Sequence, residues 1–268
     1  MDYQNLIYTP EPGGIAWVRI DNPAKMNALA PNMMEGINHY MALADDDPTI
    51  RVIVLTGVNN AFCAGSDQSR PIPEASEERA TEDGPDHHRQ SMSRGQQRTR
   101  AIRELKKPTI AMVNGPAVGA GFGMATYTDI RIGCEHARFF AYRGQIPEQG
   151  DCWNLPKIVG ISRALEILYT TPANAITAQQ AAEWGLLNKL VPCEQLEAET
   201  RAYCERIIQV PPLQQWIGKK IMWRSFDMSL DATLDWSATA AGISAMSEDR
   251  VEARTAFREK RIPVFKGR

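Results

Sequence analysis

Apolar residues in the first half of the chain form short runs separated by turns. Residues 15–20, "IAWVRI", alternate toward a strand, and residues 51–57 and 109–115 are β-branched runs closed by glycine, as expected of buried strands. Residues 33–43 have helical spacing, and residues 101–108, "AIRELKKP", predict a helix stopped by proline. Strands that alternate with helices predict a layered α/β fold with crossover connections.

Two later regions depart from this alternation. Residues 68–97 are polar, charged and poor in aromatic residues, which predicts an excursion or lid whose histidines, His87 and His88, are solvated. After Pro192 the pattern is helical to the end of the chain. We therefore divide the chain into a core, residues 1–195, and a helical C-terminal region, residues 196–268.

The C-terminal region is rich in apolar positions for an appendage. Leu196, Thr200, Tyr203 and Ile207 share one helical face, and residues 247–261 form a charged amphipathic helix. We expect the tryptophans of this region to pack on another surface or subunit rather than face water. They are Trp216, Trp223 and Trp236.

Charge and composition exclude several classes of partner. The 268 residues carry a formal net charge of −2, so no basic face is expected to bind nucleic acid. The longest apolar tract, residues 109–125, is broken by Asn114, Pro116 and glycine, which excludes a membrane helix. Residues 1–14 contain acids and proline instead of a signal-peptide pattern. A soluble, cytoplasmic protein is expected.

The number and spacing of the cysteines also favour a cytoplasmic protein. They lie at positions 63, 134, 152, 193 and 204, are odd in number and form no C-x-x-C pair. This spacing argues against a disulfide framework and against a zinc site, and it favours a reducing compartment. Cys152 is expected to be a buried structural thiol rather than a reactive one.

Glycine-rich loops follow the two buried strands. They are residues 60–69, "NAFCAGSDQS", and residues 114–123, "NGPAVGAGFG". Glycine allows close approach of the backbone to a ligand, and a helix that starts at such a loop directs N–H groups outward. Two converging amides can stabilise an enolate or oxyanion without any side chain. The alternative, a dinucleotide-binding loop, fits less well because "GAGFG" lacks the G-x-x-G ending.

The order of these motifs resembles the crotonase superfamily, also called the enoyl-CoA hydratase/isomerase family. The motifs that carry the resemblance are "RIDNPAKMNALA", "VIVLTGVNNAFCAGSDQS", "MVNGPAVGAGFGMATYTDIRIG", "LPKIVGISRALEIL", "TAQQAAEWGLLNKLVP" and "AFREKRIPVFKGR". The resemblance implies a spiral of ββα units with a C-terminal helical trimerisation region, assembled as a trimer or a dimer of trimers. It also implies an acyl-CoA thioester substrate, with no metal and no cofactor apart from the CoA of the substrate.

The resemblance assigns the oxyanion donors to the backbone N–H groups of Ser66 and Ala120. A nucleophilic role for Ser66 is the alternative, but "AGSD" is not a G-x-S-x-G motif. Residues expected along the CoA or substrate are Lys25, Ala28, Ala64, Asp67, Gln68 and Gly119, and Phe265 and Lys266 would reach the CoA of a neighbouring subunit. For two of these a simpler role stays open: Lys25 as a solvated side chain and Asp67 as a helix cap.

The resemblance also bears on the catalytic acid. Hydratases of the family use two glutamates, but here one position is Gly123 and the other falls near Arg143. Glu148, in "RGQIPEQGDCWNLPKIVG", instead resembles the base of single-acid Δ3,Δ2-enoyl-CoA isomerases. Asp151 is a second candidate acid or the cap of a helix starting near Leu155. Trp153 is a candidate for the acyl pocket or for core packing.

One base suits double-bond isomerisation. Removal of a C2 proton from a 3-enoyl thioester gives a dienolate that two amides stabilise, and the same carboxyl can return the proton at C4. The alternatives left open are hydration with a noncanonical acid or base, hydrolysis, carbon–carbon bond cleavage, and a non-catalytic acyl-CoA-binding homologue.

Overall fold

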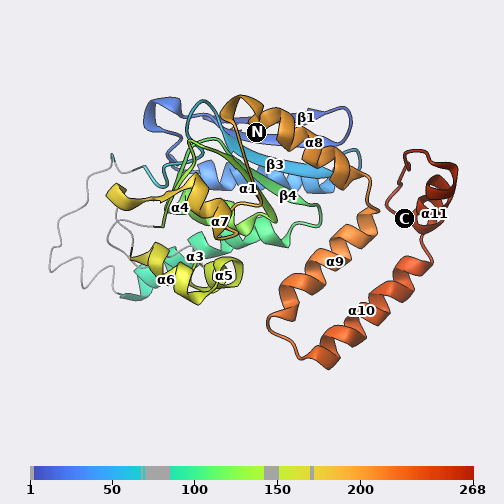
Figure 1. The fold of residues 1–268 in the computed structure, drawn as a ribbon. Helices are drawn as coiled ribbons and strands as arrows, with labels where there is room; N and C mark the ends of the chain where they lie inside the picture. The colour runs from blue at the N-terminus through green and yellow to red at the C-terminus, as the bar shows by residue number, and fades with distance from the viewer. Residues whose placement is uncertain (1–2, 68, 70–84, 142–150, 170–171) are drawn as a thin grey trace.

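The protein is built on a twisted sheet with helices on both faces (Figure 1). The computed structural model describes residues 3–67, 69, 85–141, 151–169 and 172–268. The six-stranded sheet has the order β1-β2-β3-β4-β6-β9, and a three-stranded sheet has the order β5-β7-β8. The larger sheet comprises β1 (Leu6–Glu11), β2 (Ile15–Ile20), β3 (Val52–Gly57), β4 (Thr109–Val113), β6 (Ile130–Cys134) and β9 (Lys189–Val191), and the smaller β5 (Pro116–Val118), β7 (Arg138–Phe140) and β8 (Ile176–Thr177).

The helices cover this sheet and then continue beyond it. Those of the core are η1 (Pro23–Lys25), α1 (Met33–Asp46), α3 (Pro85–Glu104), α4 (Ala120–Tyr127), α5 (Asp151–Val159), α6 (Ile161–Leu168), η2 (Pro172–Asn174) and α7 (Ala178–Glu183). The later ones are η3 (Cys193–Gln195), α8 (Leu196–Ile208), α9 (Pro212–Ser225), α10 (Leu230–Ala245) and α11 (Glu248–Glu259). Among the described residues, no helix is both long and apolar enough to cross a membrane.

The strands predicted from the sequence are confirmed. β1 and β2 are antiparallel, and β2, β3, β4, β6 and β9 pair in parallel. Every residue of β3 and β4 is buried, because apolar clusters cover both faces of the sheet. One cluster includes Ile37 of α1 and Phe122 of α4, and the other includes Trp17 of β2 and Leu196 of α8. The carboxyl ends of β3 and β4 therefore emerge side by side from a rigid core.

Residues 68–97, predicted to form an excursion or lid from their polar composition, contain regular structure in their second half. Helix α3 begins at Pro85 and runs to Glu104, so residues 85–97 are helical. Proline suits the first turn of a helix, and no further proline interrupts this one. Thr99 and Ile102 are buried, which anchors the helix against its neighbours α1 and α4. The side chains of His87 and His88 lie outside the described residues.

The chain after α8, residues 212–268, leaves the core as a C-terminal arm that contains α9, α10 and α11. Every residue from 192 onward is described, and this region contains helices and no strand, as predicted. Helix α8 packs on the sheet, whereas α9 and α10 extend away from it as a pair (Figure 1). Trp216 and Trp236 stay 38% and 41% exposed, so this chain alone does not bury them.

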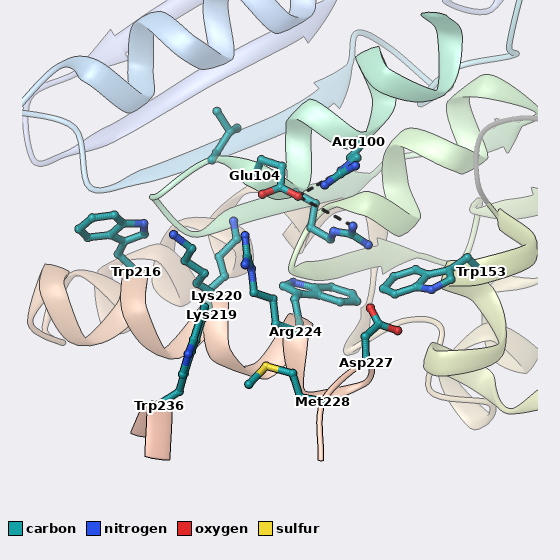
Figure 2. A pocket seen from close by; sticks show the side chains of 13 residues that line it. Arg100, Glu104, Trp153, Trp216, Lys219, Lys220, Arg224, Asp227, Met228 and Trp236 are labelled. Atoms are coloured by element: carbon teal, nitrogen blue, oxygen red, sulfur yellow. Dashed lines mark hydrogen bonds and ion pairs between the residues drawn. The ribbon is translucent and has the colours of Figure 1, made fainter. Parts of the chain in front are cut away.

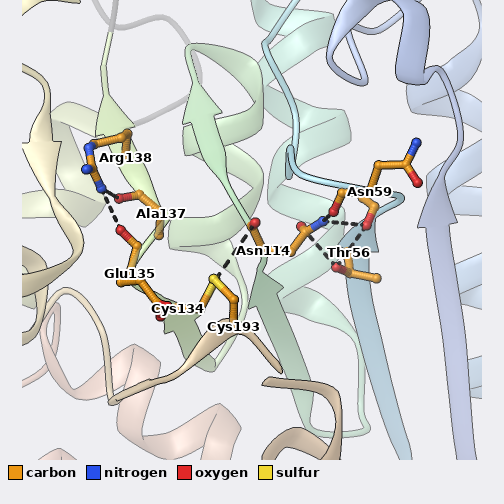
Figure 3. Close-up of a disulfide and its surroundings, with 9 residues drawn as sticks. Thr56, Asn59, Asn114, Cys134, Glu135, Ala137, Arg138 and Cys193 are labelled. Atoms are coloured by element: carbon orange, nitrogen blue, oxygen red, sulfur yellow. Dashed lines mark hydrogen bonds between the residues drawn. A yellow bond between two sulfur atoms is a disulfide. The ribbon is translucent and has the colours of Figure 1, made fainter. Parts of the chain in front are cut away.

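A disulfide joins Cys134 and Cys193, contrary to the expectation that no bridge forms (Figure 3). Neighbouring strands β6 and β9 bring the two residues together, with Cys134 opposite Val191 and a Cα–Cα distance of 4.8 Å. Sequence spacing cannot reveal this pairing, because it depends on strand order. Sulfur or nitrogen atoms of Cys134, His136 and Cys193 lie within 4.8 Å of one another, but the bridge removes both thiols as metal ligands.

The other cysteines separate into two groups. Cys63 and Cys204 are buried, whereas Cys152 is exposed, which contradicts the expectation of a buried structural thiol. Cys152 lies in the first turn of α5, where the helix turns it outward. The disulfide removes the argument from cysteine usage for a reducing compartment.

Candidate active site

The glycine-rich loops after β3 and β4 meet through their main chains. The Cys63 N–H donates to the Pro116 carbonyl at 3.0 Å, and the Val118 N–H donates to the Cys63 carbonyl at 2.9 Å. Burial raises the pKa of the Cys63 thiol to about 12, so this cysteine stays protonated at neutral pH and is no nucleophile. The loop therefore contributes backbone rather than thiol chemistry.

Glycine is required where the two loops touch. A Cβ at Gly65, whose φ is +83°, would lie 2.8 Å from the Val118 carbonyl oxygen. A Cβ at Gly121 would lie 2.3 Å from the Cys63 carbonyl oxygen. Gly119 has a φ of +51° and turns the chain into α4. The "GAGFG" sequence thus lets the start of α4 dock directly on the first loop.

This docking places the two predicted oxyanion donors at one cavity. The Leu29 N–H donates to the Gly65 carbonyl at 2.7 Å, and the Asp67 N–H donates to the Leu29 carbonyl at 3.1 Å. Since alternate residues of an extended chain direct their N–H groups to opposite sides, the Ser66 N–H points away from Leu29. Ala120 is the first residue of α4, where an N–H has no carbonyl one turn earlier to bond.

The cavity has a volume of about 320 Å³. Its lining comes from the segment before α1, from α1 and α3, from the first glycine-rich loop and from the start of α4. These residues are Leu29, Ala30, Pro31, Asn32, Met34, Glu35, Ser66, Asp67, Gly95, Arg98 and Ala120. Glu35 and Arg98 form an ion pair in this wall. The cavity therefore brings Ser66 of the first loop and Ala120 of α4 to one lining, with a charged pair in its wall.

Lys25 and Asp67 lie together beside this cavity. The Lys25 ammonium is 2.6 Å from the Asp67 carboxylate and 2.9 Å from the Ser69 hydroxyl. Hydrogen bonds from Lys25 and then Ser69 hold the pKa of Asp67 well below its ordinary value. Asp67 thus forms an ion pair rather than a helix cap, and Lys25 is not simply solvated. Ala28 is buried, and the Ala64 N–H bonds the Met26 carbonyl at 3.1 Å, which fixes the adjoining backbone.

Trp153 lines a different cavity, of about 480 Å³, between the core and α9 (Figure 2). The Arg103 guanidinium lies 4.6 Å from the centroid of its ring, and the Lys157 ammonium lies 3.5 Å from it. Trp223 lies 6.4 Å away, centroid to centroid. Arg103 is held by three rings, and burial lowers its pKa. The structure therefore places Trp153 beside α9 and α10 and not beside Ser66 and Ala120.

Phe265 and Lys266 lie far from the cavity of their own chain. The Phe265 ring lies 5.9 Å from the guanidinium of Arg51, which precedes β3, whereas Ser66 follows the opposite end of that strand. The Lys266 N–H donates to Asp249 at 2.6 Å, and its ammonium pairs with Glu248 at 3.2 Å. A role at a neighbouring subunit stays a prediction.

The predicted acid–base residue is not among those that the structure describes. Glu148, with Arg143, and Gln68 lie outside the described residues. Asp151 is the first residue of α5, so that helix begins four residues before the predicted start near Leu155; the Asp151 side chain is not described. Gly123 is buried inside α4, where it offers no side chain.

A sequence profile of the enoyl-CoA hydratase/isomerase family matches residues 11–268, which include every loop described above. The chain belongs to this family. Its fold is accordingly the crotonase fold, as the motifs implied. An enoyl-CoA hydratase structure from Bacillus anthracis superposes with a TM-score of 0.87 at 28% identity and covers 99% of this chain and 100% of that one.

Relatives with different activities are similarly close to this family member. The crotonyl-CoA hydratase of Syntrophomonas wolfei subsp. wolfei is 32% identical over 273 residues, which cover 99% of each chain. The 1,2-epoxyphenylacetyl-CoA isomerase of Escherichia coli is 29% identical over 259 residues, covering 95% of this chain and 96% of that one. Overall similarity therefore does not separate hydration from isomerisation.

Sequence reasoning missed several residues that shape the site. Asn27 is fully buried and its amide donates to the Val58 and Ala61 carbonyls, which holds the first loop in place. Asn114 does the same for the second loop through the Gly57 carbonyl at 2.8 Å. Asparagine next to glycine is a signal for Asn114, whereas Asn27 lies in "PAKMNALA" and has no such neighbour. Glu35 and Arg98 had no such signal.

Proposed function

We propose that this family member acts on acyl-CoA thioesters and isomerises the double bond of an enoyl-CoA. The observation that supports this proposal best is that Ser66 and Ala120, on loops from two different strands, line one cavity. Their amides would bind the thioester oxygen and stabilise the negative charge that develops on it when C2 loses a proton. Such stabilisation needs no metal and no redox cofactor.

Glu148 is the proposed base. It would take the C2 proton of a 3-enoyl thioester and return a proton at C4. Gly123 supports one base rather than two, because hydration in this family pairs glutamates on both sides of a water and this position has no side chain. Among the relatives, the 1,2-epoxyphenylacetyl-CoA isomerase is an example of an acyl-CoA isomerase, and the crotonyl-CoA hydratase supports hydration as the second candidate.

The CoA moiety is proposed to lie along the outer edge of the first loop. Lys25 is held there by Asp67 and keeps one cationic group next to the cavity. Ala28, Ala64 and Gly119 contribute small side chains or none, so a pantetheine arm can approach the backbone. We further propose a trimer or a dimer of trimers, in which Phe265 and Lys266 reach the CoA of a neighbouring subunit.

The test uses a 3-enoyl-CoA substrate in deuterated solvent with mass detection. Isomerisation leaves the mass of the product skeleton unchanged, hydration adds one water, and hydrolysis frees the CoA thiol. Exchange of the C2 hydrogen reports proton removal separately from turnover. We expect isomerisation with C2 exchange by the unaltered protein.

Two variants assign the roles. Glu148→Gln keeps the size of the side chain but cannot take a proton, so turnover and C2 exchange should fall together while CoA binding persists. Ala120→Pro removes one N–H and should reduce turnover by roughly 10²–10³. Full C2 exchange by Glu148→Gln would place the base elsewhere, and release of thiol by the unaltered protein would favour hydrolysis.

A further inference from the structure

The wall of the active-site cavity contains an ion pair that the proposed chemistry does not use. Glu35 in the first turn of α1 pairs with Arg98 of α3, and both residues line the cavity that Ser66 and Ala120 line. Their side chains are 38% and 43% exposed, so both present polar surface as well as contacting each other. The Arg98 carbonyl also accepts a hydrogen bond from the Asn38 amide at 2.9 Å, which fixes α3 against α1 at this point.

This pair makes the wall unfavourable for a plain hydrocarbon chain. An alkyl group that covers it would remove water from a carboxylate and a guanidinium without replacing the lost hydrogen bonds. Gly95, one turn before Arg98 on α3, has no side chain, so a substrate group has room to approach the pair. The remaining lining includes apolar Leu29 and Met34, which suit the carbon chain itself.

The charge balance decides which polar group fits. Arg98 is balanced by Glu35, and Asp67 is balanced by Lys25, so the charges of the described side chains at this cavity cancel. A substrate carboxylate would have to compete with Glu35 for Arg98 and would lose its own hydration, so it gains no net attraction from the neutral pair. A hydroxyl is neutral, and it can donate to the Glu35 carboxylate while it accepts from the Arg98 guanidinium.

We propose that this cavity selects acyl-CoA thioesters whose acyl chain carries a hydroxyl beyond C4. This hydroxyl forms hydrogen bonds with both Glu35 and Arg98. The proposal rests on the proposed function in one respect, that an acyl-CoA occupies this cavity. It adds the class of acyl group. Glu35 and Arg98 act here on specificity and not on the reacting carbons.

The experiment measures binding of saturated acyl-CoA thioesters, which have no double bond to shift or hydrate. Calorimetry compares a series of chain lengths, each as the plain acyl-CoA, the ω-hydroxy acyl-CoA and the ω-carboxy acyl-CoA. For the length that reaches the pair, the hydroxyl compound should bind about tenfold more tightly than the plain one, as for a hydrogen bond to a charged group. The carboxy compound should bind no more tightly than the plain one.

Matched variants connect this preference to the pair. Arg98→Met and Glu35→Leu should each bring the hydroxyl-to-plain affinity ratio close to one. Arg100→Met lies on the same helix but outside this cavity, with its charge paired to Glu104, and should leave the ratio unchanged. Because the ratio compares two ligands on one variant, a general loss of stability does not alter it; a thermal melt identifies any variant that fails to fold.

The outcomes separate the two proposals. Equal affinity for hydroxyl and plain compounds at every length would overturn the inference, as would tighter binding of the carboxy compound or a preference that survives in Arg98→Met. Each of these three results leaves the isomerase proposal standing if 3-enoyl-CoA is converted. Failure of every acyl-CoA to bind would overturn both, whereas a hydroxyl preference without isomerisation would overturn the proposed reaction alone.

Discussion

The sheet core and the C-terminal arm have similar helices but very different surroundings. In the core, Phe62 and Phe122 are fully buried and lie at the loops that form the candidate site. In the arm, α9 and α10 contain no buried residue, and large apolar side chains are open to solvent: Leu230 is 73% exposed, Met246 83% and Phe257 85%.

The difference shows that helix caps and the packing of an apolar face contribute separately to helix formation. Ser229 and Ser247 cap α10 and α11 by accepting hydrogen bonds from Ala232 and Arg250. Caps fix where a helix begins, but helices of this length are marginal in water without a packed face. The core provides that face within one chain. The arm is expected to find it on other copies of the chain.

The largest effect expected from this comparison is the difference in stability between two phenylalanine variants, one in each region. Phe122→Ala should reduce the free energy of unfolding by about 3–5 kcal/mol, because it leaves a cavity beneath the second loop. Phe257→Ala should change it by less than about 0.5 kcal/mol in a dilute, unassembled sample. Denaturant unfolding followed by circular dichroism measures both.

Assembly sharpens the result for Phe257. If the arm packs on neighbouring copies, Phe257→Ala should weaken association about tenfold in sedimentation experiments, as for an interface side chain worth more than ~1 kcal/mol. Equal destabilisation by Phe122→Ala and Phe257→Ala in the dilute sample would contradict the comparison. Unchanged assembly would remove Phe257 from the interface.

The next effect concerns the end of the core. The disulfide closes a loop with a sequence separation of 59 between Cys134 and Cys193, just before the chain enters α8. Replacing both cysteines by serine should lower the free energy of unfolding by about 2–4 kcal/mol. Cys152→Ser, at an exposed position, is the control and should have little effect.

Reductant provides a second measurement of the same bridge. The unaltered protein should lose stability in dithiothreitol by the amount that the double variant loses, and the double variant should not respond. A melting temperature of the unaltered protein that does not change on reduction would show that the bridge contributes nothing to the stability of the core.

The smallest effect is a pH dependence within the arm. Glu252 accepts hydrogen bonds from Arg261 at 2.5 Å and 2.8 Å and from the Val264 N–H, which lower its pKa to about 2. Since the folded pKa lies below the ordinary value of 4.5, this stabilisation is complete above pH 4.5 and is lost as the pH falls toward 2. Proteolysis of the C-terminal segment should therefore be faster for Glu252→Gln at neutral pH.

The pH series provides the check. The difference between Glu252→Gln and the unaltered protein should shrink between pH 4.5 and pH 2, when an acid-active protease is used. Glu205→Gln is a matched control, with the same change of charge on α8, which packs on the sheet. A difference that grows on acidification would show that the carboxylate does not stabilise the segment.

The features predictable from the sequence were those with a local cause. The strands at residues 51–57 and 109–115 follow from short β-branched runs, and the two loops follow from glycine after a strand. The disulfide and the Glu35–Arg98 pair join residues far apart in the sequence, so only the folded chain brings them together. The start of α3 at Pro85 was missed because polar composition was taken as evidence against regular structure.

The contact of backbone with backbone at Gly65 and Gly121 has a consequence for engineering. Any side chain at either position would collide with a carbonyl oxygen, so libraries that randomise these positions would consist almost entirely of misfolded proteins. The α1 and α3 wall has no such constraint, since its side chains end in partly exposed groups. On the roles proposed above, substrate range can be redesigned from Glu35 and Arg98 while Ser66 and Ala120 remain as they are.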